Sequence, residues 1–207
     1  MTKSLRRSRW PQKNMKMNNI WCLPESLNIG GSDFRIRTDF RVILDILGYF
    51  DSPDYEEDEK LEICKRILYP DWREIPPELT QEALEMAVWF IDGGNNSQSG
   101  GKKSNIRLMD WEQDAQMIIP AINKVAGMEI RAARHLHWWT FLGYYMEIGE
   151  SLYTTVIGLR QKKAKGKKLE KAEQAFYRDN KDLVDLKIRY SKEELAEQER
   201  LKAILDG

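Results

Sequence analysis

The side chains that could perform chemistry in this sequence are few and poorly placed for it. His135 and His137 are the only histidines, and on a helix a spacing of two residues puts them on different faces, unlike the i, i+4 pair of a zinc-binding helix. Cys64 lies in the apolar stripe of an expected helix, where a thiol acts as a small apolar side chain. These placements support neither a metal centre nor a nucleophilic triad, so we expect no catalytic residue, no metal and no cofactor.

Two further stretches have the composition of functional motifs but not their spacing. The segment 100–104 (GGKKS) has Asn96 where a phosphate-binding loop requires glycine, and no buried strand precedes it. The acidic segment 54–59 (DYEEDE) lacks the ligand spacing and the glycine of a calcium loop. Its charges fit the start of a helix, where the helix dipole favours acidic side chains.

Two clusters could contact a partner. The segment 137–141 (HWWTF) is followed by Tyr144 and Tyr145. Trp138 and Trp139 lie about 100° apart on a helix, so they need a surround wider than one neighbouring helix, either a core or a partner. The lysine-rich segment 160–171 is either a solvated connection or a surface for an acidic protein or nucleic acid, although it lacks the interleaved aromatics of single-strand binders.

Composition excludes several classes of protein. The chain has 207 residues, 33 basic and 33 acidic side chains, two cysteines and 42% hydrophobic residues. Zero net charge argues against a protein that coats nucleic acid. No apolar run approaches the roughly 20 residues that cross a bilayer, and a disulfide framework would need more cysteines.

Hydrophobic spacing predicts a mainly α fold, an irregular multi-helix bundle with a small N-terminal β-hairpin. The hairpin is expected over 27–36, turning at Gly30 and Gly31, and Thr38 is expected to cap the first helix. The helix over 80–91 is expected to bury a stripe made of Leu84, Ala87, Val88 and Ile91. Asp110 and Gln113 are expected to form the capping pair of another helix, and Ser191 and Glu194 that of the last. The expected helices cover 39–50, 56–69, 80–91, 110–127, 130–148, 151–163 and the residues after 191.

Composition along the chain predicts four segments. Residues 1–19 carry only basic charges and are expected to form a disordered leader. Residues 20–92 hold the hairpin and three helices. Residues 93–105 (GGNNSQSGGKKSN) have the composition of a flexible linker, either between domains or as a loop within one. Residues 106–207 form a C-terminal helical part whose last helices are highly charged.

Six stretches taken in order resemble the bacteriophage "gene product fifteen" family, from the tail gene cluster of phages and prophages of Gram-positive bacteria. The stretches are 36–40 (IRTDF), 67–70 (ILYP), 87–91 (AVWFI), 110–114 (DWEQD), 137–141 (HWWTF) and 156–160 (VIGLR). The resemblance covers roughly residues 24–190, and HWWTF with an arginine about twenty residues later is its most specific part.

The resemblance implies a non-enzymatic tail-assembly chaperone or accessory protein that acts in the host bacterial cytoplasm. Its expected partners are the tape-measure protein and other tail-assembly proteins such as the tail tube, with no membrane; self-association is left open. Asp110 matches the family pattern, and the candidate partner-binding residues are Trp138, Trp139, Phe141, Tyr145 and Arg160. The alternative is a phage nucleic-acid-associated protein that uses residues 160–171.

Overall fold

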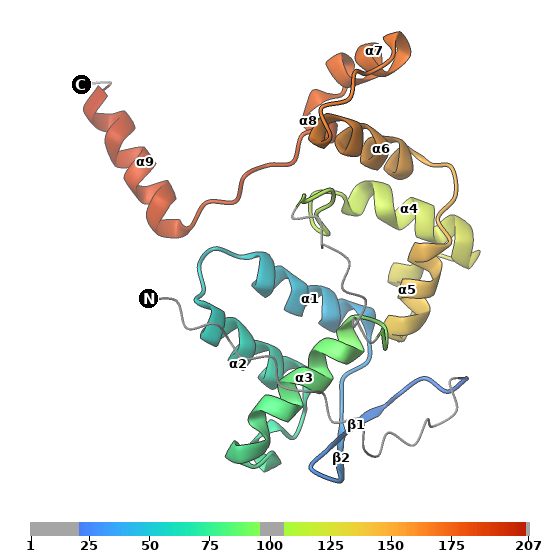
Figure 1. The fold of residues 1–207 in the computed structure, drawn as a ribbon, viewed down its shortest axis with the longest axis vertical. Coiled ribbons are helices and arrows are strands. Elements are labelled where there is room, and N and C mark those ends of the chain that lie inside the picture. The colour runs from blue at the N-terminus through green and yellow to red at the C-terminus, as the bar shows by residue number, and fades with distance from the viewer. Residues whose placement is uncertain (1–20, 96–105, 206–207) are drawn as a thin grey trace.

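The computed structural model describes residues 21–95 and 106–205 and contains a β-hairpin followed by helices (Figure 1). The leader expected over 1–19 and most of the linker expected over 93–105 lie outside the described residues. The strands are β1 (Ser26–Ile29) and β2 (Ser32–Arg35). The α-helices are α1 (Phe40–Asp51), α2 (Glu57–Leu68), α3 (Thr80–Ile91), α4 (Ala115–Ala126), α5 (Trp138–Met146), α6 (Leu152–Ala164), α7 (Lys171–Asp179), α8 (Lys181–Val184) and α9 (Lys192–Leu205). Short 3-10 turns lie at Trp72–Glu74, Pro77–Leu79 and Ile130–Ala132. The prediction of a mainly α fold with an N-terminal hairpin is confirmed.

The hairpin turns where the two glycines predicted it. Strands β1 and β2 are antiparallel, with Ile29 paired to Ser32, and Gly30 and Gly31 have φ angles of 57° and 87°. Two positive φ angles in succession are typical of the tight turn that suits the twist of a hairpin. Leu27 and Ile29 are buried, and the Gly30 N–H donates to Glu82 on α3, so one face of the ribbon packs on that helix.

We expect Gly30→Ala to destabilise the fold more than Gly31→Ala. Both substitutions force alanine into a positive φ, which costs about 1–2 kcal/mol of stability. A β-carbon at Gly30 would also collide with the Leu79 side chain, whereas a β-carbon at Gly31 would have no atom within 4 Å. The midpoint of urea unfolding should fall for both variants and further for Gly30→Ala. Equal midpoints would show that Leu79 yields without cost.

The three N-terminal helices follow the predicted bounds closely, with two corrections. Asp39, not Thr38, caps α1, because the Asp39 carboxylate accepts the Arg41 N–H at 3.0 Å while the Thr38 hydroxyl contacts His135. The buried face of α3 is Ala83, Ala87, Phe90 and Ile91, and Val88 is exposed. The core side of this helix is therefore rotated from the stripe expected for it.

The C-terminal part differs most from expectation. Helix α4 begins at Ala115, not at Asp110, and the Gln113 side chain turns to the Asp185 carbonyl instead of reaching back to Asp110. Residues 130–148 do not form one helix: a 3-10 turn and an extended stretch precede α5. The extended stretch is held by α1, since Phe40 N–H donates to the Leu136 carbonyl at 2.9 Å and Trp138 N–H donates to the Thr38 carbonyl at 2.7 Å. These bonds between distant parts of the chain replace the helical ones.

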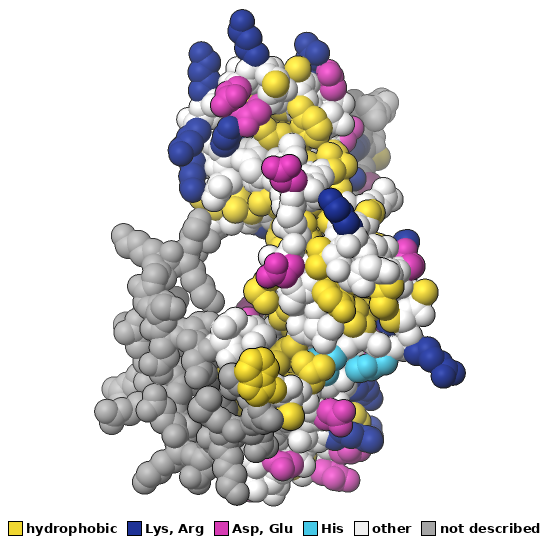
Figure 2. Space-filling view, turned by 90° about the vertical axis from the view of Figure 1, so that its right-hand side faces the viewer, with side chains coloured by type: hydrophobic (Ala, Val, Ile, Leu, Met, Phe, Trp, Pro, Cys, Tyr) yellow, Lys and Arg dark blue, Asp and Glu magenta, His cyan; other side chains and the backbone are white. Residues whose placement is uncertain are grey.

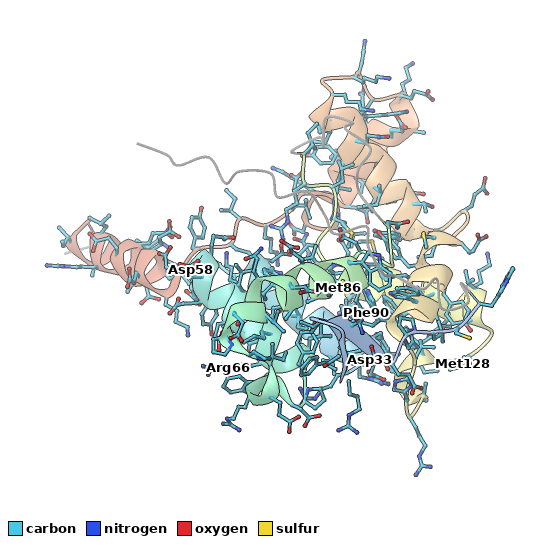
Figure 3. The ribbon with its side chains drawn as sticks, turned by 60° about the horizontal axis from the view of Figure 1, so that its bottom comes forward. Asp33, Asp58, Arg66, Met86, Phe90 and Met128 are labelled. Atoms are coloured by element: carbon cyan, nitrogen blue, oxygen red, sulfur yellow. The ribbon has the colours of Figure 1, made fainter. Side chains whose placement is uncertain are left out.

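One hydrophobic cluster draws on both sides of the undescribed segment 96–105. Phe40 of α1 stacks on Phe141 of α5 with ring centroids 4.7 Å apart, and Trp138 donates its indole N–H to the Ile91 carbonyl at the end of α3. Phe90 is fully buried inside the molecule, whereas Asp58 and Met128 lie at its outside (Figure 3). The hairpin, α1–α3 and α4–α6 thus share their apolar side chains.

Helix α9 stands away from the rest of the molecule (Figure 1). The predicted capping pair at its start is confirmed, because Ser191 N–H donates to the Glu194 carboxylate and Glu194 N–H donates to the Ser191 hydroxyl. Its apolar side chains Leu195, Leu201 and Ile204 are exposed. Within the described ranges, no helix has the length and apolar character to cross a membrane.

Candidate functional site

The aromatic cluster predicted around 137–141 is mostly internal. Trp138 is 1% exposed and stacks on Phe141 at 5.5 Å between ring centroids. Trp139 is half-buried, donates its indole N–H to the Phe90 carbonyl at 2.8 Å and meets Trp89 edge-on. The two tryptophans therefore face different surroundings, as their spacing predicted, although α5 begins only at Trp138.

Trp111 extends this cluster to the surface and was missed as a site residue in the sequence. Its ring lies 5.0 Å from Tyr145 and 6.0 Å from Phe141, and it is only half-buried. The Tyr145 hydroxyl in turn contacts the Tyr153 hydroxyl at 2.5 Å. The helix expected over 110–127 would include Trp111, but the residue precedes α4 and lies in a turn.

Arg160 is buried and paired within the molecule. Its guanidinium binds both oxygens of Asp114, at 2.6 and 2.8 Å, and also donates to three backbone carbonyls. Those carbonyls belong to Leu108, Leu183 and Val184. The structure thus gives Arg160, Trp138 and Phe141 internal contacts, and partner binding by the five residues named from the sequence stays a prediction.

Asp110, which matches the family pattern, lies beside this pair. Burial acts to raise the pKa of its carboxyl, but hydrogen bonds from the Gln113 N–H and the Arg189 guanidinium outweigh burial and hold that pKa below its usual range. Arg189 binds Asp110 at 3.0 Å and Glu112 at 3.2 Å. Asp110 is therefore ionised at neutral pH and ties the residues after α8 to the turn before α4.

His137 is the N-cap residue of α5 and forms an isolated β-bridge with Asp39, so the structure corrects its predicted place within a helix. Its ring accepts the Trp139 N–H, and its other nitrogen lies 3.0 Å from the Pro24 carbonyl. Burial lowers the pKa of His137, and the Pro24 bond offsets this in part. The folded state therefore favours the neutral ring.

We expect the free energy of unfolding to fall as the pH drops below about 6.5, because the unfolded chain then takes up a proton that folded His137 resists. One such proton gives a slope of at most about 1.4 kcal/mol per pH unit. Urea titrations between pH 5 and 7 should show a smaller slope for His137→Gln than for His135→Gln, a substitution of an exposed ring two residues away. Equal slopes would assign the pH dependence to other groups.

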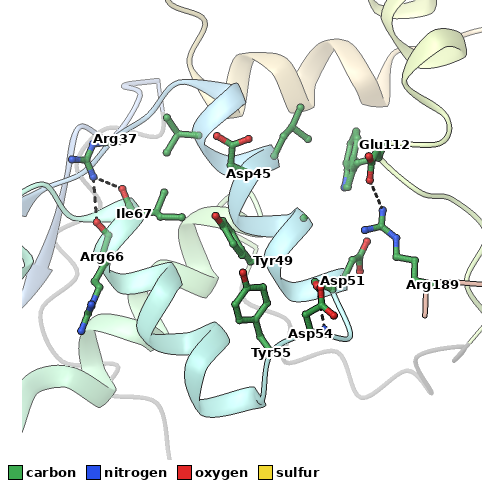
Figure 4. Close-up of a pocket in the computed structure, with 15 residues that line it drawn as sticks. Arg37, Asp45, Tyr49, Asp51, Asp54, Tyr55, Arg66, Ile67, Glu112 and Arg189 are labelled. Carbon is green, nitrogen blue, oxygen red and sulfur yellow. Dashed lines mark hydrogen bonds and ion pairs between the residues drawn. The ribbon is translucent and has the colours of Figure 1, made fainter. Parts of the chain in front are cut away.

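An open groove of about 1010 Å³ runs along the outer face of α1 (Figure 4). Val42, Asp45 and Tyr49 project into it from α1, and Trp111 forms part of its wall, so the surface edge of the aromatic cluster is also the edge of the groove. Arg37 and Arg66 lie at one end and Arg189 with Glu112 at the other. The remaining lining residues are Leu44, Gly48, Asp51, Ser52, Asp54, Tyr55 and Ile67.

The lysine-rich segment forms a second surface. Lys162 and Lys163 are paired to Glu173 and Asp185. No ion pair within the described part of the chain involves the four exposed lysines in and after the turn that ends α6, Lys165, Lys167, Lys168 and Lys171. Basic side chains gather at the end of the molecule formed by α6 and α7 (Figure 2).

Two properties of the described residues bear on possible chemistry. Among them, no group of three or more His, Cys, Asp or Glu could hold a metal. Burial raises the pKa of the Cys64 thiol to about 12, so it is protonated at neutral pH and is a poor nucleophile. The groove on α1, with Trp111 in its wall, is the candidate functional site.

Comparison with known proteins identifies a family model that matches most of the chain. The family model described as "Bacteriophage Gp15 protein" matches residues 21–186, which include the whole hairpin and α1–α8. No curated protein and no solved structure matches the chain.

Proposed function

The chain belongs to the bacteriophage Gp15 protein family, and from that premise we propose that it is a non-enzymatic tail-assembly chaperone or accessory protein. It binds the tape-measure protein in the host bacterial cytoplasm before the tail tube encloses that protein. The groove on α1 receives one amphipathic helix of the partner. Binding is reversible, because the tube must displace this protein from the tape measure.

The single observation that carries the proposal is the form of the groove. Apolar side chains line the groove together with charged ones: Val42 and Leu44 of α1, Ile67 of α2 and Trp111 before α4. A lining of this kind suits an amphipathic partner helix in a helix-in-groove complex. Asp45 is an exposed carboxylate in the groove and has no ion pair to the described residues. We therefore infer that the bound helix places a lysine or arginine against Asp45.

Asp45→Lys is expected to weaken binding of the tape-measure protein at least tenfold while leaving the midpoint of thermal unfolding unchanged. The matched control is Asp58→Lys, an equal charge change at an exposed position in α2 outside the groove. Affinity is measured by titration calorimetry after the two proteins are shown to co-elute from a size-exclusion column. Failure of the wild-type chain to co-elute contradicts the proposed function, and equal affinity of both variants contradicts the groove as its site.

A second candidate function, nucleic-acid binding, rests on the four lysines without ion pairs at the α6–α7 turn. Binding that depends on lysine–phosphate contacts weakens steeply as the salt concentration rises. Affinity for a DNA or RNA duplex should therefore fall at least tenfold between 50 and 200 mM salt. Replacing Lys165, Lys167 and Lys168 by glutamine should abolish binding. No detectable binding at 50 mM salt would exclude this candidate.

A further inference from the structure

The chain segment 185–191, called the strap below, joins α8 to α9 and is fastened by polar contacts. The side-chain amide of Gln113 donates to the Asp185 carbonyl and accepts the Lys187 N–H, both at 2.9 Å. Arg189 binds Asp110 and Glu112. At the far end, the Lys192 N–H donates to Asp54 in the α1–α2 connection at 2.7 Å.

The strap lacks a buried apolar anchor. Val184 is fully buried just before it, but within the strap Leu186 is only half-buried, Ile188 is 72% exposed and Tyr190 is 42% exposed. Helix α9, which follows, exposes its own leucines and adds no apolar anchor from that end. Polar contacts at a surface are exchanged for water at small net cost, so a segment held in this way opens locally more readily than a packed helix does.

The strap also separates two hollows. The groove on α1 is lined at one end by Arg189, and a second hollow is lined by 186–189 of the strap together with Lys60 and Arg107. Asp51, Ser52 and Arg189 line both hollows, so they form the partition between them. In Figure 4, Arg189 projects from the strap toward Glu112 at the end of the groove, across from Asp51 and Asp54.

We propose that the strap is a displaceable cover whose release joins the two hollows into one longer groove that passes the end of α1. The closed state is the one in the structure, with Arg189 held by Asp110. The open state frees the strap from Gln113 and Arg189 from its carboxylates while Val184 and the Arg160 pair stay in place. This inference rests on the proposed function only for the identity of the molecule that enters the groove. The partner helix then has a short binding site when the strap is closed and a longer binding site when the strap is open.

The test measures how fast a thiol at the partition becomes accessible in the full chain without any partner. A Cys22→Ser, Ser52→Cys background places the reporter in the partition and removes the exposed native cysteine. Buried Cys64 remains as an internal reporter of global unfolding. Labelling by a maleimide is followed by mass spectrometry for Arg189→Ala and Gln113→Ala. The matched control is Arg178→Ala, which removes an exposed arginine that is paired only to its neighbour Asp179.

We expect the thiol introduced at position 52 to be labelled at least fivefold faster in both strap variants than in the control, while Cys64 is labelled at the control rate. Gln113→Ala is the decisive variant, because it breaks two strap contacts and leaves both cations of buried Asp110, Arg107 and Arg189, in place. Rates within twofold of the control would overturn the proposal. So would a parallel rise at Cys64, since opening would then be global. Because no partner is present, these outcomes are independent of whether the tape-measure protein binds.

Discussion

Replacing Arg160 with alanine is expected to lower the free energy of unfolding by about 3–5 kcal/mol, the largest effect of any single charge in the described chain. The reason is the carboxylate that remains. Asp114 is fully buried and both of its oxygens are bound by Arg160, so the variant leaves a charge inside the protein without a counter-charge. The carbonyls of Leu183 and Val184 also lose their donor. Urea unfolding followed by circular dichroism measures the loss.

One further variant shows whether geometry or charge matters at this pair, and a second serves as an exposed control. Arg160→Lys keeps the charge, but an ammonium cannot bind two carboxylate oxygens and three carbonyls in the planar arrangement of a guanidinium, so we expect an intermediate loss. Arg178→Ala removes an exposed arginine and should change the free energy by less than about 0.5 kcal/mol. A loss below about 1 kcal/mol for Arg160→Ala would mean that Asp114 takes up a proton or water instead.

Trp138→Ala is expected to cost about 3–5 kcal/mol, because it empties a site among Phe141, Trp111 and the end of α3. Trp138→Phe keeps most of the ring volume and loses the hydrogen bond to Ile91, so its cost should be well below that of alanine. Thermal and urea unfolding of both variants measure the difference. Equal costs would show that the hydrogen bond, and not packing, accounts for the effect.

The same phenylalanine variant separates a structural role from a partner contact. If Trp138 acts through the core alone, Trp138→Phe at a temperature where it is fully folded should bind the proposed partner, the tape-measure protein, as tightly as the wild-type chain does. Trp139→Phe is the matched variant at the half-buried neighbour. A loss of affinity confined to Trp138→Phe would return Trp138 to the set of contact residues.

Local signals predicted the N-terminal half of the fold well. Gly30 and Gly31 specify the turn through their positive φ angles, the acidic segment 54–59 marks the start of α2, and Thr80 and Ile91 bound α3 in both sequence and structure. Where prediction failed, a distant residue decided the outcome. Thr38 and Asp39 are both residue types that cap helices well. Asp39 caps α1 in the structure, and its carboxylate also accepts the N–H of the distant Leu136.

The site was harder to predict for the same reason. Arg160 and Asp114 are 46 residues apart, and Gln113 meets the strap about 72 residues later, so no spacing rule connects them. The aromatic residues around Trp138 were correctly identified as a cluster. Trp111 connects this cluster to the groove on α1. Its position there depends on how α4 and α5 pack, and hydrophobic periodicity does not specify that packing.

The contact between Asp39 and the stretch before α5 has a consequence for how the protein is made on the ribosome. Arg41 sits beside Asp39 and donates to the carbonyls of Arg131 and Ala133, about ninety residues later. The first three helices are therefore synthesised long before the backbone that completes them leaves the exit tunnel. Until then, Phe40 and its neighbours lack their cover, and the nascent chain depends on the speed of translation or on host folding factors to avoid aggregation.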